Sequence, residues 1–254
     1  MNRLAIAALA SAALVASVLV GCSASTGGAL IKLPMSVGGT GTSTFTTPLG
    51  WTVTLRTVRI ALGPWYFNVN RQPSTTTAQS GVVIIQATEQ KVVDPLDTTL
   101  VPLNGGADGE SGEAFTVDIG LLPPDDQQSS ADLAVLGKSQ AYIEGTAVKG
   151  ATTVLFAGFV QIDSSLATPQ VPLQVLQRVS GASVDLTFVS SEQQLIMRVN
   201  PTHWFDRTDF GQLLSGEPSD AGVYTWTITS SFHSNLLNGI KSLEGVYQFN
   251  LEGP

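Results

Sequence analysis

The chain has 254 residues, of which 43% are apolar and only 13% are charged, and its formal net charge is −8. An acidic chain poor in Lys and Arg argues against a nucleic-acid partner and against electrostatic binding to anionic lipid, because both need clustered cations. Cys22 is the sole cysteine, which excludes an internal disulfide, a thiolate metal site and a CxxC redox motif.

The first 21 residues have the layout of a secretory signal. Arg3 gives a positive start, residues 4–19 are apolar apart from two serines, and small residues surround a cut site. The apolar stretch is shorter than the ~20 residues that a membrane-spanning helix needs. We therefore predict a signal peptide over residues 1–21.

The end of this segment, Leu19-Val20-Gly21-Cys22, resembles the lipobox of bacterial lipoproteins. The resemblance covers only the first 22 residues, and it implies lipidation of Cys22, cleavage before it and acylation of the new amino terminus. Acyl chains contribute ~0.8 kcal/mol per buried CH₂, so two or three of them anchor a protein stably to a membrane. Ser23 follows the cysteine, which in Gram-negative lipoproteins implies the outer membrane, facing the periplasm or the cell surface. An ordinary signal peptide with a chance cysteine is the alternative.

Residues 22–50 are rich in Ser, Thr and Gly, a composition typical of a flexible tether between a lipid anchor and a domain. Within this segment, residues 29–35 are apolar enough to form a first edge strand. Residues 36–43 are too small to bury much surface. We therefore predict that one folded domain spans residues 51–254.

From residue 51 onwards, alternating apolar and polar residues predict β-strands. Trp51, Val53 and Leu55 share one face, and the alternation then slips by one residue before Val58. Such a slip predicts a β-bulge inside one strand. A further strand is predicted over residues 81–87, where a continuous apolar run indicates burial on both faces.

The middle of the chain alternates between predicted loops and a strand. Residues 102–113 are dense in Gly, Asp and Glu and predict a loop. A strand is predicted over residues 114–120, and residues 121–130, with two prolines and two aspartates in a row, predict another exposed loop.

The second half of the chain predicts paired strands. Residues 140–148 and 151–161 predict a hairpin that turns at Lys149-Gly150, where glycine supplies a positive φ. Residues 183–189 and 194–199 alternate in the same way and predict a second pair.

The last strands are predicted over residues 222–229 and 246–251. Helix is scarce. An Asn-Pro start predicts one or two short helices between residues 201 and 215, and residues 231–238 predict another that ends at Gly239.

Many short strands with turn signals between them predict an all-β fold, a β-sandwich of immunoglobulin-like or jelly-roll-like type with one or two short helices. A sandwich of this length is compatible with a single domain. The alternative is a division into two domains near residues 121–130. The tryptophans are predicted to anchor the core rather than line an exposed ligand face: Trp51, Trp65, Trp204 and Trp226.

The first candidate site is His203 with Asp206. If the segment is helical, the two side chains lie at i and i+3 on one face, and a carboxylate can orient an imidazole for acid–base or metal chemistry. The alternative is an ordinary helix start, with Trp204 and Phe205 packed on the sheet.

The second candidate is a metal site formed by His203, His233 and Asp206, with Met197 as a further ligand. Imidazoles and a thioether suit copper, and imidazoles also suit zinc. The two histidines are distant in sequence, and Met197 alternates with apolar strand residues, so core packing is the alternative for Met197.

The third candidate is a calcium site in the acidic loop, with Asp108, Glu110 and Glu113 as ligands. An EF-hand match fails, because Gly106 and Phe115 fall where carboxylates belong. A looser calcium loop and a mobile surface loop both remain open.

The sequence contains no G-x-S-x-G, S-x-x-K, P-loop or H-E-x-x-H motif and predicts no cofactor beyond these candidate metals. The leading hypothesis is therefore a membrane-anchored envelope lipoprotein that has a non-catalytic role in binding or assembly with an envelope protein partner. The alternative is a periplasmic lipoprotein that binds a metal or small ligand through His203 and His233. A third hypothesis is an enzyme of unrecognised type around His203 and Asp206.

Overall fold

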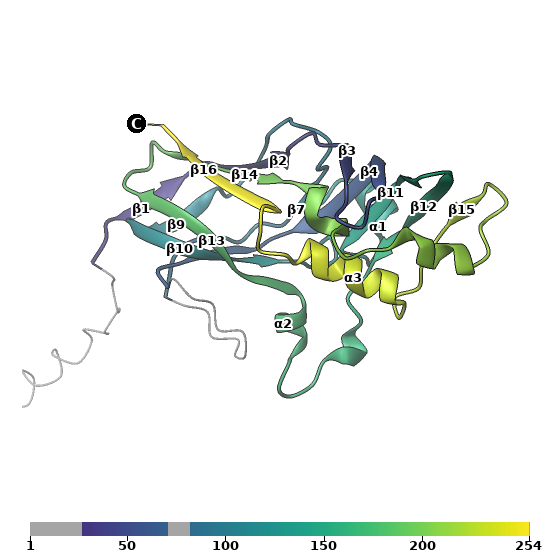
Figure 1. Ribbon diagram of the computed structural model, residues 1–254. Coiled ribbons are helices and arrows are strands. Elements are labelled where there is room, and N and C mark those ends of the chain that lie inside the picture. Colours follow the sequence, from purple (N-terminus) through teal and green to yellow (C-terminus); the bar gives the residue numbers. More distant parts are fainter. Residues whose placement is uncertain (1–26, 71–81, 254) are drawn as a thin grey trace, which may run out of the picture.

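The computed structural model describes residues 27–70 and 82–253 and shows an all-β sandwich with short helices along its sides (Figure 1). The predicted signal peptide, residues 1–21, and Cys22 lie outside the described residues. The strands form three hydrogen-bonded sheets. The predicted fold class is confirmed.

The first sheet has the strand order β1-β9-β6-β5-β10-β13. Its strands are β1 (Leu30–Leu33), β9 (Ala107–Glu110), β6 (Val83–Ala87), β5 (Trp65–Asn68), β10 (Gly112–Gly120) and β13 (Arg178–Phe188).

The second sheet has the order β15-β12-β11-β4-β3, and β7 also pairs with β4. Its strands are β15 (Val223–Tyr224), β12 (Thr152–Val160), β11 (Ala141–Lys149), β4 (Thr52–Leu62), β3 (Thr44–Thr46) and β7 (Lys91–Val93). The third sheet has the order β16-β14-β2-β8. Its strands are β16 (Tyr247–Glu252), β14 (Gln194–Val199), β2 (Met35–Gly39) and β8 (Val101–Pro102).

The short helices predicted between residues 201 and 215 and over residues 231–238 are present, and the described residues contain three more. Ser129 caps the amino terminus of the first helix in the chain, because its Oγ accepts a hydrogen bond from the Asp132 amide at 3.1 Å. None of the described helices is long and apolar enough to span a bilayer. The α-helices are α1 (Ser130–Leu136), α2 (Leu173–Leu176) and α3 (Ser231–Ile240), and the 3-10 helices are η1 (Ser164–Leu166), η2 (Pro201–Phe205) and η3 (Phe210–Ser215).

Two local predictions are confirmed in the second sheet. Glu144 of β11 lies opposite Thr57 of β4, and the next residue, Gly145, lies opposite Leu55. Arg56, between Thr57 and Leu55, is therefore the bulged residue. The hairpin of β11 and β12 turns at Gly150, whose φ is +59°. A local alternation and a local glycine were sufficient for both predictions.

The amino-terminal boundary of the domain is corrected. Within the predicted tether, residues 22–50, the chain contributes β1, β2 and β3, and every residue of β2 is buried. A Cβ on Gly39 would lie 2.2 Å from the carbonyl oxygen of Pro95. The glycines here therefore admit a neighbouring backbone rather than provide flexibility. The predicted first strand, residues 29–35, is confirmed as β1 and the start of β2.

The predicted pairing of residues 183–189 with 194–199 is wrong. Both segments are strands, but β13 pairs with β10 in the first sheet, whereas β14 pairs with β16 and β2 in the third. The turn between them carries the chain from one sheet to another. Alternation therefore located the strands and did not locate their partners.

The strand predicted over residues 222–229 is also shorter in the structure, where β15 is only Val223–Tyr224. The chain leaves the sheet because Trp226 turns towards the core. Its Nε1 donates to the carbonyl oxygen of Phe159 at 2.8 Å, and its ring centroid lies 4.9 Å from that of Phe232.

A continuous apolar core joins the sheets. Trp65 of the first sheet donates its Nε1–H to the sulfur of Met197 in the third sheet at 3.2 Å. Phe67 of the first sheet lies edge-on to Phe249 of the third, with centroids 5.5 Å apart. The core role predicted for the tryptophans is confirmed, because none of the four is more than 9% exposed.

Candidate functional site

The His203–Asp206 pair lies at the end of η2, with Asp206 directly after the helix. The Asn200 side chain accepts a hydrogen bond from the Thr202 amide at 3.1 Å and caps the helix. Trp204 and Phe205 are fully buried and hold η2 against the core. This anchoring turns His203 and Asp206 outwards, with side chains 43% and 38% exposed.

The two side chains contact each other directly. His203 Nδ1 lies 2.9 Å from Asp206 Oδ2. A carboxylate on one ring nitrogen orients the imidazole and leaves Nε2 for a ligand or a proton. Gly245, with φ +70°, packs at the Nε2 edge, where a Cβ would lie 3.2 Å from Nε2. A larger side chain at residue 245 would crowd this edge of the ring, and glycine does not.

The imidazole opens onto a polar cleft of about 270 Å³ between η2 and the end of α3. Among the described residues, the hydrogen bond that His203 makes to a side chain is the one to Asp206. Because its lining is polar and charged, the cleft can hold a small polar ligand by hydrogen bonds and charge. Among the described residues, no serine side chain is hydrogen-bonded to His203. Its lining is His203, Asp206, Arg207, Asn238, Gly239, Ser242 and Glu244.

His233 has a different environment. It lies in the first turn of α3 and is 3% exposed. Its Nε2 accepts a hydrogen bond from the Gln161 amide at 3.1 Å. Burial lowers the pKa of His233 below its usual value, against the opposing effect of hydrogen bonding to the backbone of Gln161 and Ile228. His233 is thus a neutral group that joins α3 to the end of β12.

The predicted metal ligands are not gathered at one point. His203 and His233 line two different clefts, and Met197 is fully buried against Trp65. In residues 27–70 and 82–253, no group of three or more His, Cys, Asp or Glu side chains is arranged to hold a metal ion. Of the predicted set, the structure brings together only His203 and Asp206.

The predicted acidic loop, residues 102–113, is confirmed only over residues 103–106, and most of its second half is strand. Asp108 and Glu110 belong to β9, and Glu113 belongs to β10. A Cβ on Gly109 would lie 1.8 Å from the carbonyl oxygen of Ile84, so this glycine allows β6 to approach. The three carboxylates occupy separate strand positions and do not ring a loop.

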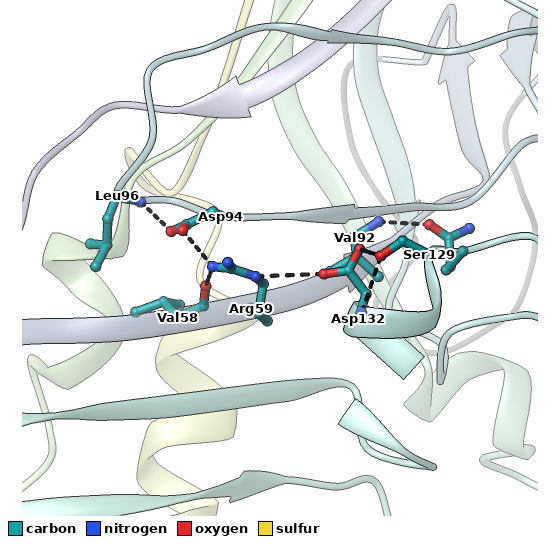
Figure 2. A network of polar contacts seen from close by, with 8 residues as sticks. Val58, Arg59, Val92, Asp94, Leu96, Ser129 and Asp132 are labelled. Carbon is teal, nitrogen blue, oxygen red and sulfur yellow. Dashed lines mark hydrogen bonds and ion pairs between the residues drawn. The ribbon is translucent and has the colours of Figure 1, made fainter. Parts of the chain in front are cut away.

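A polar network that the sequence did not reveal surrounds Arg59 of β4 (Figure 2). The guanidinium donates to the Val58 carbonyl oxygen at 2.8 Å, pairs with Asp94, and lies 3.5 Å from Asp132 Oδ1 at the start of α1. Asp94 in turn accepts from the Leu96 amide at 2.9 Å. Arg59 therefore ties the segment after β7 and the start of α1 to β4, which is a structural role.

Next to this network lies a small hollow of about 160 Å³, and Arg59, Asp97 and Asp132 all line it. Hydrogen bonds from the Thr99 backbone and side chain lower the pKa of Asp97. The nearest sequence signal is the capping pattern Ser129-Ser130-Ala131-Asp132 at the start of α1, where Asp132 accepts a hydrogen bond from Ser129 Oγ at 2.6 Å.

Comparison with known proteins gives no family. No protein-family model matches the chain, and no curated protein is significantly similar in sequence. A solved structure, MbnP from Methylosinus trichosporium, resembles it with a TM-score of 0.32 and 9% identity, over 80% of this chain and 83% of that one. These values are too low to assign this chain to the family of that protein.

Proposed function

We propose that the protein is a lipid-anchored protein of the cell envelope with a non-catalytic role in binding or assembly. The observation that carries the proposal is the lipobox-like Leu19-Val20-Gly21-Cys22 at the end of a secretory signal. An extended chain spans at most ~3.6 Å per residue, so the start of β1 lies within roughly 30 Å of the lipidated residue. The β1 end of the domain then faces the bilayer.

Exposed apolar side chains at this end support that orientation. Leu30 of β1 is 85% exposed, and Val189 in the turn after β13 is 58% exposed. The Lys32 amide donates to Ser191 Oγ at 3.1 Å, which holds this turn beside β1. Figure 1 shows both elements at one end of the molecule, away from β15. The exposed Lys32 and Glu192 carry opposite charges at this end, so its contribution to lipid contact is apolar rather than a net electrostatic attraction.

A surface suited to a protein partner lies on the outer face of β11 and β12. Tyr142 and Phe159 are directly opposite each other, with ring centroids 5.1 Å apart, and Phe159 is 45% exposed. Leu155 and Val148 on the same face are also exposed. Aromatic rings with an apolar surround are typical of interface centres. Figure 1 shows β11 and β12 far from β1, so this face would stay accessible to a partner when the β1 end is anchored to a membrane.

Substitution of Cys22 tests the anchor. In the native host, the unsubstituted protein is expected to fractionate with membranes and to carry acyl mass on residue 22. Cys22→Ala is expected to move it entirely to the soluble fraction, because the acyl chains supply the binding free energy. Ser25→Ala, three residues further along the chain, is the matched control and should stay with membranes. An unmodified residue 22 or an uncleaved start in the native protein contradicts the proposal.

A second candidate function is binding of a metal or a small polar ligand in the His203 cleft. The contact of Nδ1 with Asp206 and the partly exposed imidazole in the cleft favour it. Under this candidate, copper(II) or zinc added at micromolar concentration binds saturably in calorimetry, and His203→Ala weakens binding at least tenfold. His233→Gln should leave binding unchanged, because that residue lines another cleft. Absence of saturable binding removes the metal form of this candidate.

A further inference from the structure

A second cleft, of about 230 Å³, lies between α3 and the segment that crosses from β12 to β13. Figure 1 shows α2 of this segment on the same side of the molecule as α3. The walls are largely aliphatic, with Leu166 from η1, Ile228 from the loop before α3, and Leu237 from α3 itself. Polar side chains complete the lining, among them His233 and Lys241, and a cleft that combines apolar walls with convergent polar groups is typical of small-ligand sites.

Lys241 stands at one side of this cleft, just after the last turn of α3. Its Nζ donates to the carbonyl oxygen of Leu176 at 2.8 Å. An ammonium has three donors, and in residues 27–70 and 82–253 no ion pair involves this lysine. Burial lowers its pKa, with no carboxylate raising it.

A partly buried cation without an anion is unfavourable, because its desolvation is not offset by charge pairing. The one carboxylate among the lining residues, Asp163, caps η1, where its Oδ1 accepts from the Ser165 amide at 2.8 Å, and no ion pair joins it to Lys241. His233 offers no positive charge, because its buried ring is neutral and accepts from Gln161. The ammonium of Lys241 therefore has donor capacity for an external anion.

We propose that this cleft binds a small amphiphilic carboxylic acid, with the carboxylate at Lys241 Nζ and the hydrocarbon part among Leu166, Ile228 and Leu237. At the ~30 Å³ that one water occupies in the liquid, the volume holds roughly eight non-hydrogen atoms. Hexanoate has that size. The proposal is independent of the lipid anchor, because it rests on residues of the domain alone.

The experiment is a titration of the purified protein with hexanoate and with hexan-1-ol, its uncharged counterpart, followed by two-dimensional NMR of backbone amides. A Cys22→Ala preparation is titrated in parallel, because it has no acyl chain that could compete with hexanoate for the cleft. We expect hexanoate to bind saturably, to shift amides of α3 and of the loop at Ile228, and to bind at least tenfold more tightly than hexan-1-ol.

Two variants locate the charge. Lys241→Met keeps an unbranched side chain and should weaken hexanoate at least tenfold while leaving hexan-1-ol unchanged. Lys241→Arg should retain binding, which separates loss of charge from loss of folding, and Lys138→Met on the exposed surface is the matched control. Equal affinity for acid and alcohol, unchanged binding in Lys241→Met, or no binding at all would overturn the proposal.

Discussion

Replacement of Phe210 by Ala is expected to lower the free energy of unfolding by about 3–5 kcal/mol, the usual cost of removing a buried aromatic ring. Phe210 lies in η3 with no exposed surface. Its ring centroid lies 4.8 Å from that of Phe156 in β12 and 5.4 Å from that of Phe205 in η2. It also contacts Trp51 at 5.6 Å and Phe232 of α3 at 5.4 Å. One ring therefore joins a sheet to three helices.

Chemical denaturation followed by tryptophan fluorescence measures this loss. Phe159→Ala is the matched control, since that ring is 45% exposed and its removal should cost much less. If Phe210→Ala lost less than about 1 kcal/mol, the cavity would have to collapse easily, and the ring would not be the junction that its contacts indicate.

Substitution of Gly239 by Ala is expected to destabilise the protein by about 1–3 kcal/mol, although alanine favours helices by roughly 1 kcal/mol over glycine. Gly239 lies inside α3, where the sequence had predicted the helix to end. A Cβ there would lie 2.0 Å from the carbonyl oxygen of Trp204 and 2.8 Å from its Cα. These are backbone atoms of η2, which Trp204 itself anchors in the core, so the two helices must separate.

The thermal midpoint of Gly239→Ala is expected to fall by several degrees, since 1 kcal/mol corresponds to ~2–4 °C for a chain of this size. Gly105→Ala is the control, because no atom lies within 4 Å of a Cβ at that position. A more stable Gly239→Ala would show that helix propensity outweighs the close approach. Because His203 also lies on η2, a displaced η2 should change the NMR signals of its imidazole as well.

Much of the strand pattern could be predicted from the sequence, because alternation is a local property of the chain. The bulge near Arg56 and the turn at Gly150 were predicted for the same reason. The partners of β13 and β14 could not be predicted, since they depend on contacts between distant segments. Glycines were misinterpreted: Gly39 and Gly109 permit a close backbone approach rather than form a tether or a loop.

The candidate sites follow the same division. His203 and Asp206 are three residues apart, and the helical spacing alone predicted their contact. Arg59 and Asp94 are separated by 35 positions, and nothing in either local sequence relates them. The Lys241 cleft combines two distant segments, as the bond from Lys241 to Leu176, 65 positions away, shows. Such sites become visible only when the sheets bring their elements together.

The insertion of β2 into the third sheet affects the order in which the chain can fold. β2 lies between β8 and β14, and Gln194 of β14 bonds Ser36 from 158 positions further along. A ribosome produces the amino-terminal strand first, so its edge stays open while most of the polypeptide is still being made. Completion of the third sheet must await the final sixty or so residues, and nascent molecules need protection from one another until then.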